Sequence, residues 1–187
     1  MHIARWFLAA CCSATLASCG QPLGEYELET IELTAEAPLP EGVRGPSYGQ
    51  YLKVELSSKT SLTEIADKID GVYAHADFCP FSDPYSLRSF GPFSSDNVDL
   101  GVPSVAEPLQ RGSDGKFHYN VFIVPKHPMP DVTYSKAARE EEAYDILSNG
   151  RDVCLRFEAP GYDIIKSKSA MIRMPYEQIA ASLSSGL

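Results

Sequence analysis

The sequence has few cations for its size and no apolar run long enough to cross a membrane. Of its 187 residues, 16 are Lys or Arg and 25 are Asp or Glu, which gives a formal net charge of −9. Nucleic-acid binding requires clustered cations that neutralise phosphates, so this balance argues against nucleic acid as a partner. It also argues against electrostatic attachment to anionic lipid, which depends on polybasic segments.

Sequence motifs of common catalytic sites are missing or badly placed. The chain has no Gly-x-Gly-x-x-Gly and no phosphate-loop sequence. The Gly-x-Ser-x-Gly match around Ser47 lies in a Pro- and Gly-rich loop, without the strand-to-helix setting that exposes a nucleophile. The many acids would suit a carboxylate pair for glycan hydrolysis, but no pattern selects a pair. We therefore expect no enzyme and no cofactor, with a small hydrolase as the alternative.

The first residues have the layout of a secretory signal. Arg5 precedes an uncharged apolar run from Trp6 to about Leu16, and small residues follow. A transmembrane helix needs roughly 20 apolar residues, and this run is shorter.

The stretch Leu16-Ala17-Ser18-Cys19 resembles the lipobox of bacterial lipoproteins. This resemblance implies lipidation of Cys19, cleavage before it, and attachment to the periplasmic face of a membrane. Gly20 and Gln21 follow the cysteine, and the absence of aspartate there favours the outer membrane. The predicted organisation is a signal peptide at 1–18, a lipid-anchored tether at 19–24 and one domain at 25–187. In the alternative interpretation, Cys19 is only a small residue of an ordinary cleaved signal.

Cysteine use predicts one disulfide. Cys11 and Cys12 leave with the signal and Cys19 carries lipid, so Cys79 and Cys154 remain. Two cysteines in an oxidising compartment are most simply paired.

Hydrophobic periodicity predicts a mainly β domain with one or two short helices. Alternation indicates strands, and helical spacing with a cap at Ser61 or Thr60 and an acid at Glu64 indicates a helix. A change of phase near Thr30 predicts a bulge or bend in the first strand. The expected strands are 25–37, 50–58, 71–79, 151–159 and 167–175, and 113–125 is expected to be a turn followed by the strongest strand. The expected helices are 61–70, 135–150 and a turn at 176–183, and 80–110 is the least regular region.

Strands at intervals and one crosslink favour a disulfide-linked β-sandwich with an immunoglobulin-like look. The tryptophan that packs on the disulfide in antibody domains has no counterpart, since Trp6 belongs to the signal.

The stretch HADFC places His75, Asp77 and Cys79 at alternate positions, so all three can face one side of a strand. These are credible metal-ligand types, and His118 or His127 is a candidate fourth ligand. A disulfide at Cys79 removes the thiolate, which leaves His75 and Asp77 as weak candidates and favours no metal.

Four aromatic residues stand among Ser, Asp and Gly in the least regular region. Aromatic residues are enriched at binding hot spots, which makes this group a candidate partner-binding surface. Alternatively, the rings cover the open end of the sandwich near the disulfide. The residues are Phe81, Tyr85, Phe90 and Phe93.

The predicted function is non-catalytic binding of an envelope protein. Acid-rich stretches such as EYELETIELTAE are usually solvated faces, but they also suit a basic partner, because charge complementarity speeds association. One predicted role is an inhibitor or immunity protein against a cell-wall-targeting effector, such as a basic wall hydrolase. The other is an accessory subunit of an envelope or secretion assembly.

Overall fold

The computed structural model describes most of the chain after the first 21 residues, and within that part the protein is mainly β with one disulfide. The described residues are 22–39, 42, 45, 49–69, 71–81, 87–101, 109–127, 143–160 and 167–185. The lipobox and Cys19 lie outside them, as does Tyr85.

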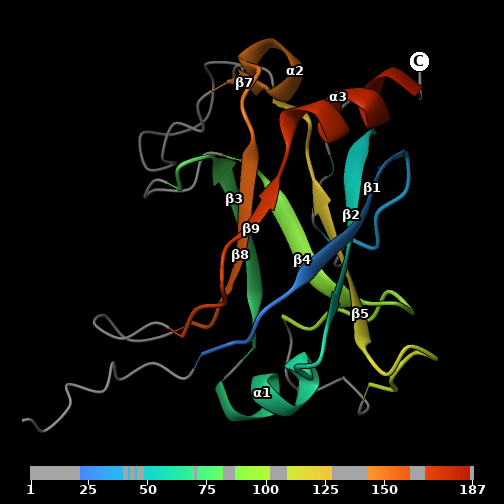
Figure 1. Ribbon diagram of the computed structural model, residues 1–187, viewed down its shortest axis with the longest axis vertical. Coiled ribbons are helices and arrows are strands. Elements are labelled where there is room, and N and C mark those ends of the chain that lie inside the picture. The colour runs from blue at the N-terminus through green and yellow to red at the C-terminus, as the bar shows by residue number, and fades with distance from the viewer. Residues whose placement is uncertain are drawn as a thin grey trace, which may run out of the picture.

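A four-stranded antiparallel sheet forms one side of the domain (Figure 1). The alternation that predicted the second strand is confirmed, because Leu52, Val54 and Leu56 are buried while Lys53 and Glu55 remain partly exposed. The strands, in spatial order, are β1 (Glu27–Thr34), β2 (Tyr51–Ser58), β5 (Phe117–Ile123) and β4 (Ser89–Ser94).

The predicted irregularity in the first strand is confirmed as a bulge. Leu28 lies opposite Leu56 and Thr30 lies opposite Glu55, so Glu29 is an extra residue on β1. The extra residue changes which side chains face the core, and it explains the change of hydrophobic phase near Thr30.

A three-stranded antiparallel sheet forms the other side, and two short strands form a separate two-stranded ribbon. The three-stranded sheet has the order β3 (Tyr73–Phe78), β8 (Val153–Glu158) and β9 (Ile172–Met174), and the ribbon pairs β6 (Lys126–His127) with β7 (Tyr144–Asp145).

Both ends of the domain carry a helix (Figure 1). The helix α1 (Leu62–Ile69) begins as predicted, since the hydroxyl of Ser61 accepts a hydrogen bond from the Glu64 N–H over 3.4 Å. At the other end, α3 (Tyr176–Ser185) is a full helix where a single turn was predicted.

The predicted helix at 135–150 is confirmed only over its last turn in the described part. Residues 128–142 lie outside the described residues, and Tyr144 and Asp145 pair as a strand with β6. Asp145 is extended, with φ −143°, and its carboxylate accepts the Ser148 N–H, so helix α2 (Ile146–Asn149) begins only after it. The predicted stop at Gly150 is confirmed by its left-handed φ of 66°.

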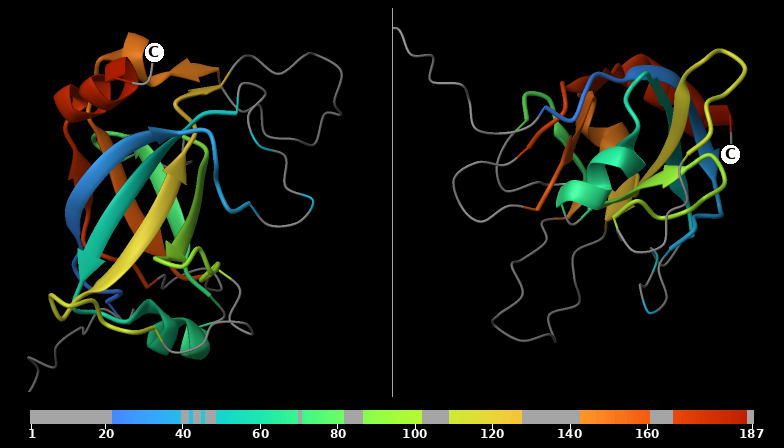
Figure 2. Two further views of the ribbon diagram at one scale, coloured as in Figure 1. Left: turned by 90° about the vertical axis from the view of Figure 1, so that its right-hand side faces the viewer. Right: turned by 90° about the horizontal axis from the view of Figure 1, so that it is seen from below.

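The two sheets share one hydrophobic core, with the helix α3 packed beside β1 (Figure 2). Buried side chains from β2 and β5 meet those from β3, β8 and β9. A second, smaller cluster consists of Tyr51, Phe93, Phe122 and Val124, next to Ala37, Leu39 and Phe90.

The sheets are separate ladders that individual hydrogen bonds link at their edges. The Leu23 N–H donates to the Lys168 carbonyl over 3.1 Å on the β1–β9 side, and the Leu87 N–H donates to the Ala76 carbonyl over 3.3 Å on the β3–β4 side. On the second of these sides, the edges of β3 and β4 meet without forming a continuous ladder, and we call this boundary the seam.

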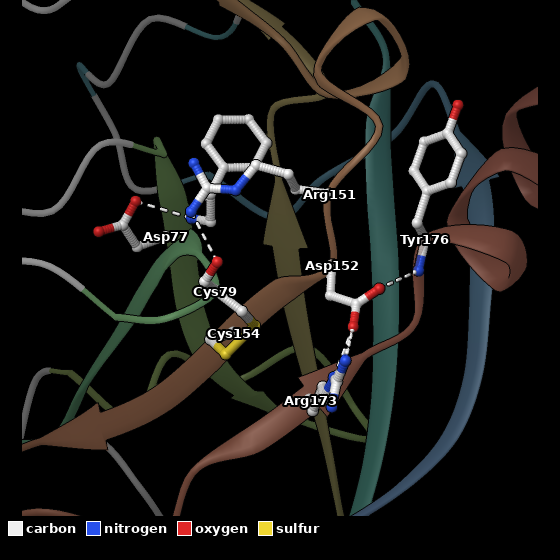
Figure 3. The surroundings of a disulfide bond; sticks show 8 residues. Asp77, Cys79, Arg151, Asp152, Cys154, Arg173 and Tyr176 are labelled. Carbon is white, nitrogen blue, oxygen red and sulfur yellow. Dashed lines mark hydrogen bonds and ion pairs between the residues drawn. A yellow bond between two sulfur atoms is a disulfide. The ribbon is translucent and has the colours of Figure 1, made fainter.

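The predicted Cys79–Cys154 disulfide is confirmed (Figure 3). Cys79 directly follows β3 and Cys154 lies in β8, with 5.2 Å between their Cα atoms. These strands are neighbours in one sheet, whereas the disulfide of antibody domains joins two sheets.

Candidate functional site

A pocket of about 510 Å³ opens in the seam between β3 and β4. Pockets of this size are typical of sites for small ligands. We call it the seam pocket, and the residues that line it are Tyr73, Ala74, His75, Leu87, Arg88, Ser89, Phe90, Gly91, Phe93, Asp99 and Gly101.

A bulge in β4 lies in the wall of the seam pocket. Phe90 pairs with Phe122 and Phe93 pairs with Asn120, so β4 holds one more residue than β5 over this stretch. Gly91 has φ 110°, and a Cβ there would lie 3.0 Å from the Asn120 carbonyl oxygen. This backbone therefore requires glycine, and β4 departs from a regular ladder where it borders the pocket.

The loop at residues 99–101 closes one side of the pocket. Its position is fixed by a hydrogen bond from the Leu100 N–H to the Pro92 carbonyl over 3.0 Å. The Asp99 carboxylate accepts the Gly101 N–H over 2.8 Å. The pocket is thus built from three separate segments, at 73–75, 87–93 and 99–101.

Three aromatic side chains line the pocket, and they differ in exposure. Tyr73 is 44% exposed, Phe90 is half-buried, and Phe93 is only 1% exposed. The Arg88 guanidinium carbon lies 5.2 Å from the centre of the Phe90 ring. Phe93 also packs edge-on against Phe122 and is part of the smaller core cluster, so Tyr73 and Phe90 are the rings a ligand can reach.

A buried carboxylate with several basic neighbours lies on β8, opposite Tyr73 of β3. Glu158 is 2% exposed, and its nearest cation is Arg156 at 2.5 Å. The Lys168 amine lies 3.4 Å from the same oxygen, and His75 Nε2 lies 4.0 Å from the other. Burying a carboxylate is costly unless cations compensate its charge, and Arg156 and Lys168 both lie within reach of it.

The metal-ligand candidates are held in other contacts. Cys79 is oxidised, and the buried Asp77 carboxylate accepts the Phe78 N–H over 2.7 Å and points toward Arg151 (Figure 3). Within the described part of the chain, no three His, Cys, Asp or Glu side chains gather as a metal site would require.

The two histidines considered as a fourth ligand lie elsewhere. His118, on β5 of the other sheet, lies 3.2 Å from the Asp114 carboxylate, and the His127 ring lies 5.9 Å from that of Tyr144.

The aromatic residues predicted to form one surface lie in two places. Phe90 and Phe93 belong to β4, a strand within the region predicted to be irregular. The Phe81 ring instead lies 4.0 Å from the guanidinium carbon of Arg156, on the three-stranded sheet. Tyr85 lies outside the described residues.

Sequence reasoning missed Tyr73, Arg88 and Asp99 as pocket residues. No local spacing connects them, because strand pairing and the loop at 99–101 bring them together. The only local signal is the Gly91-Pro92 pair, which marks the break in β4.

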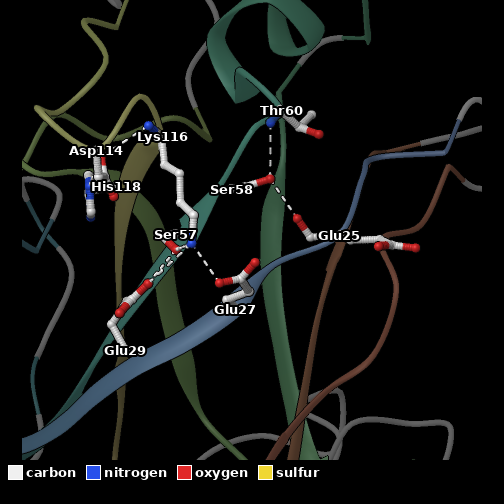
Figure 4. A network of polar contacts seen from close by, with 9 residues as sticks. All are labelled: Glu25, Glu27, Glu29, Ser57, Ser58, Thr60, Asp114, Lys116 and His118. Atoms are coloured by element: carbon white, nitrogen blue, oxygen red, sulfur yellow. Dashed lines mark hydrogen bonds and ion pairs between the residues drawn. The ribbon is translucent and has the colours of Figure 1, made fainter.

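A row of exposed carboxylates follows β1 and its flanks, and we call it the acidic strip. Lys116 lies against part of it, with its amine 2.6 Å from Glu27 and 3.9 Å from Glu29 (Figure 4). The hydrogen bond to Glu27 raises the pKa of Lys116. The residues of the strip are Glu25, Glu27, Glu29, Glu32 and Glu36.

The outer edge of β1 is covered beside the strip. The Ser182 hydroxyl, from α3, donates to the Ile31 carbonyl over 2.6 Å. This bond occupies one carbonyl at the outer edge of β1 and protects that point of the edge from pairing with another strand.

Comparison with protein-family models, with curated proteins and with solved structures gives no match for this chain. None of the helices in the described part has the length and hydropathy of a membrane-spanning segment.

Proposed function

We propose that this protein is a lipid-anchored envelope protein that binds another protein without catalysing a reaction on it. The observation that supports this function is the acidic strip. Five glutamates lie exposed along one strand and its flanks, and Glu27 and Glu29 keep exposed fractions of 72% and 42% although Lys116 lies beside them.

Such a strip suits a basic partner. Like charges held close together repel one another, and a partner with a matching row of cations relieves that repulsion. Complementary charges raise the association rate by steering the encounter. The strip can also serve simply as a solvated face, and the experiment below separates the two interpretations.

The proposed location follows from the lipobox resemblance and the disulfide. Lipid on Cys19 and the tether at 19–24 would hold the domain at the periplasmic face, with the outer membrane favoured. A disulfide fits that oxidising compartment. In this proposal the two sheets pack as a sandwich with an immunoglobulin-like look, which provides a rigid support for the strip.

Two roles agree with a basic partner. An inhibitor or immunity protein would block a cell-wall-targeting effector, such as a basic wall hydrolase. An accessory subunit would bind a component of an envelope or secretion assembly.

The alternative, a small hydrolase that acts on peptidoglycan or another glycan, has less support. It requires two carboxyl groups facing each other across a cleft. Among the described residues that line the seam pocket, Asp99 is the one carboxylic acid, and it already accepts the Gly101 N–H.

The test is capture of partners from envelope extract by the tagged, full-length protein, followed by mass spectrometry. We expect one stoichiometric basic partner, and we expect its association to slow by about tenfold when Glu25, Glu32 and Glu36 are changed to Gln. The matched control changes three exposed acids away from the strip, Glu64, Asp96 and Glu177, to their amides. Equal slowing by both triple variants, or no change with either, would contradict a role for the strip.

A further inference from the structure

The first described residues of the chain are packed into the domain. Leu23 is fully buried and belongs to the main hydrophobic core. Its N–H donates to the Lys168 carbonyl over 3.1 Å, and the Gly24 carbonyl accepts the Ala170 N–H over 3.0 Å. The Tyr26 hydroxyl donates to the Leu23 carbonyl over 2.7 Å. Two backbone bonds, one side-chain bond and a buried leucine therefore fix this part of the chain, and we call residues 22–25 the packed segment.

The packed segment lies at the end of the domain that carries α1. The Ser58 hydroxyl donates to the Glu25 carbonyl over 2.6 Å and accepts the Thr60 N–H over 3.0 Å (Figure 4). A Cβ on Gly24 would collide with the Thr60 hydroxyl, so the packed segment passes directly against the turn that precedes α1. The helix α3 lies at the opposite end of the domain (Figure 1).

The link between the proposed lipid and the packed segment is short. Cys19 and Pro22 are three residues apart, and an extended chain spans at most about 3.6 Å per residue, so their Cα atoms lie within about 11 Å of each other. Acyl chains lie in the hydrocarbon layer, so a lipidated cysteine lies at the level of the headgroups. With lipid on Cys19, the α1 end of the domain is therefore held beside the headgroups.

The α3 end lies farther from the packed segment than this link can reach. The eight residues of β2 span about 25 Å, and the strand ends at Ser58, which contacts the packed segment. The acidic strip follows β1 in the same direction, because Glu27 lies opposite Ser57 and Thr34 lies opposite Tyr51 at the other end of β2. Laying β1 on the bilayer would bring these carboxylates against anionic headgroups, and the repulsion of like charges disfavours that orientation.

We propose that the short link to Cys19 holds the domain with its α1 end against the bilayer surface and its α3 end away from it. The surface that faces the headgroups consists of the packed segment and the turn at 58–61. This inference rests on the lipid anchor of the proposed function and adds an orientation to it. In this orientation, Glu32 and Glu36 form the part of the acidic strip that a protein partner reaches first.

Fluorescent labels at the two ends of the domain test the orientation. Lys59→Cys places a thiol in the turn before α1, and Gln178→Cys is the matched variant on α3, since both residues are exposed and polar. Cys79 and Cys154 are joined in the disulfide and do not react, and lipid would block the thiol of Cys19. Each full-length variant is labelled with a thiol-reactive fluorophore and placed in phosphatidylcholine vesicles, with and without a nitroxide on the lipid headgroup.

Nitroxides quench fluorescence only at short range, so the two positions are expected to differ. Given a link of about 11 Å and a distance of about 25 Å along β2, we expect the loss of emission to be about threefold larger at position 59 than at position 178. Phosphatidylcholine has no net charge, so attraction between charges does not orient the domain in these vesicles. Equal quenching at the two positions, or stronger quenching at position 178, would overturn the proposal.

Flotation of the vesicles before the measurement separates this inference from the proposed function. Protein that fails to float with the vesicles would refute the lipid anchor, and the orientation with it. Protein that floats but is quenched equally at both positions would refute the orientation alone.

A longer link tests whether the short link is the cause of the orientation. Inserting about twelve Gly and Ser residues between Gln21 and Pro22 gives a flexible linker with an r.m.s. length of about 19 Å. We expect this insertion to reduce the quenching at position 59 by about twofold. Adding the same residues after Leu187 is the control, because it leaves the link unchanged. Unchanged quenching after the insertion would show that another contact holds the α1 end, and would overturn the role of the short link.

Discussion

The carboxylate of Asp152 accepts a hydrogen bond from the backbone N–H of Tyr176 over 2.9 Å, and so joins the start of β8 to the first residue of α3 (Figure 3). Its other oxygen pairs with the Arg173 guanidinium on β9. One side chain thus connects two strands and a helix close to the disulfide. The hydrogen bond to Tyr176, and then the contact with Arg173, hold the pKa of Asp152 below its usual range.

We expect Asp152→Asn to lower the Tm at pH 7. We also expect the difference in Tm between the variant and the parent protein to become smaller as the pH is lowered. A carboxyl whose pKa is lower in the folded protein stabilises it above the unfolded pKa, which is about 3.9 for Asp. That contribution is lost as the pH falls through the folded pKa. Thermal unfolding of the variant and of the parent protein between pH 7 and pH 2 measures this difference in Tm. The control is Asp96→Asn, at an exposed turn. A difference in Tm that does not change with pH would show that the charge of Asp152 does not contribute to the stability of the folded protein.

Tyr119→Phe is expected to destabilise the protein through two hydrogen bonds. The buried hydroxyl donates to the Thr60 carbonyl over 2.7 Å and accepts the Leu62 N–H, at the start of α1, over 3.0 Å. Leaving these buried backbone groups without a partner costs about 1–3 kcal/mol of unfolding free energy. Denaturant unfolding measures the loss. Tyr176→Phe is the control, because its hydroxyl donates to the Leu147 carbonyl near the surface, and a similar loss in both would contradict the explanation.

Local patterns predicted the features that depend on local chemistry. The alternation of Leu52, Val54 and Leu56 located β2, the Ser61 cap located α1, and the phase change near Thr30 located the bulge in β1. The disulfide followed from counting cysteines. Each of these inferences uses neighbouring residues or composition, which a sequence displays directly.

The features that were missed depend on pairing between distant segments. The strand β4 contains Gly91-Pro92, which is typical of a loop, and it is a strand because its flanking residues pair with β5. Asp145 lies in a helix-like stretch, but pairing with Lys126 keeps it extended. The seam pocket needs β3, β4 and the loop at 99–101 together, so no single stretch of sequence shows it.

Phe93→Ala is expected to destabilise the protein much more than Phe90→Ala. Phe93 is 1% exposed and packs against Phe122 and its neighbours, so its removal leaves a cavity that costs about 3–5 kcal/mol. Phe90 is half-buried, so its loss removes less buried surface. Denaturant unfolding of the two variants makes the comparison. Equal losses would mean that Phe90 is as much a core residue as Phe93 and is a poor candidate for ligand contact.

Replacing Cys79 and Cys154 together by Ser is expected to lower the unfolding free energy by about 2–5 kcal/mol. The crosslink spans 75 residues, and it restricts the unfolded chain more strongly than a crosslink over a short loop would. Denaturant unfolding of the double variant and of the oxidised protein measures the difference. Mass analysis after alkylation provides the control, because the oxidised protein is expected to show no reactive thiol at these two positions.

Cys19→Ala is expected to move the protein from the membrane fraction to the soluble fraction. The lipobox resemblance predicts acyl chains on Cys19, and each buried methylene contributes about 0.8 kcal/mol to membrane affinity, so more than one chain gives stable attachment. The net charge of −9 argues against a compensating attraction to anionic lipid, so we expect the acyl chains to be the anchor. Fractionation of cells that express the full-length protein, followed by a salt wash, measures the change. Ser18→Ala keeps a small residue before the cysteine and is the matched control, with the protein expected to stay on the membrane. If Cys19→Ala also stayed there after the salt wash, lipid on Cys19 would not be the anchor, and the proposed location would have to rest on another contact.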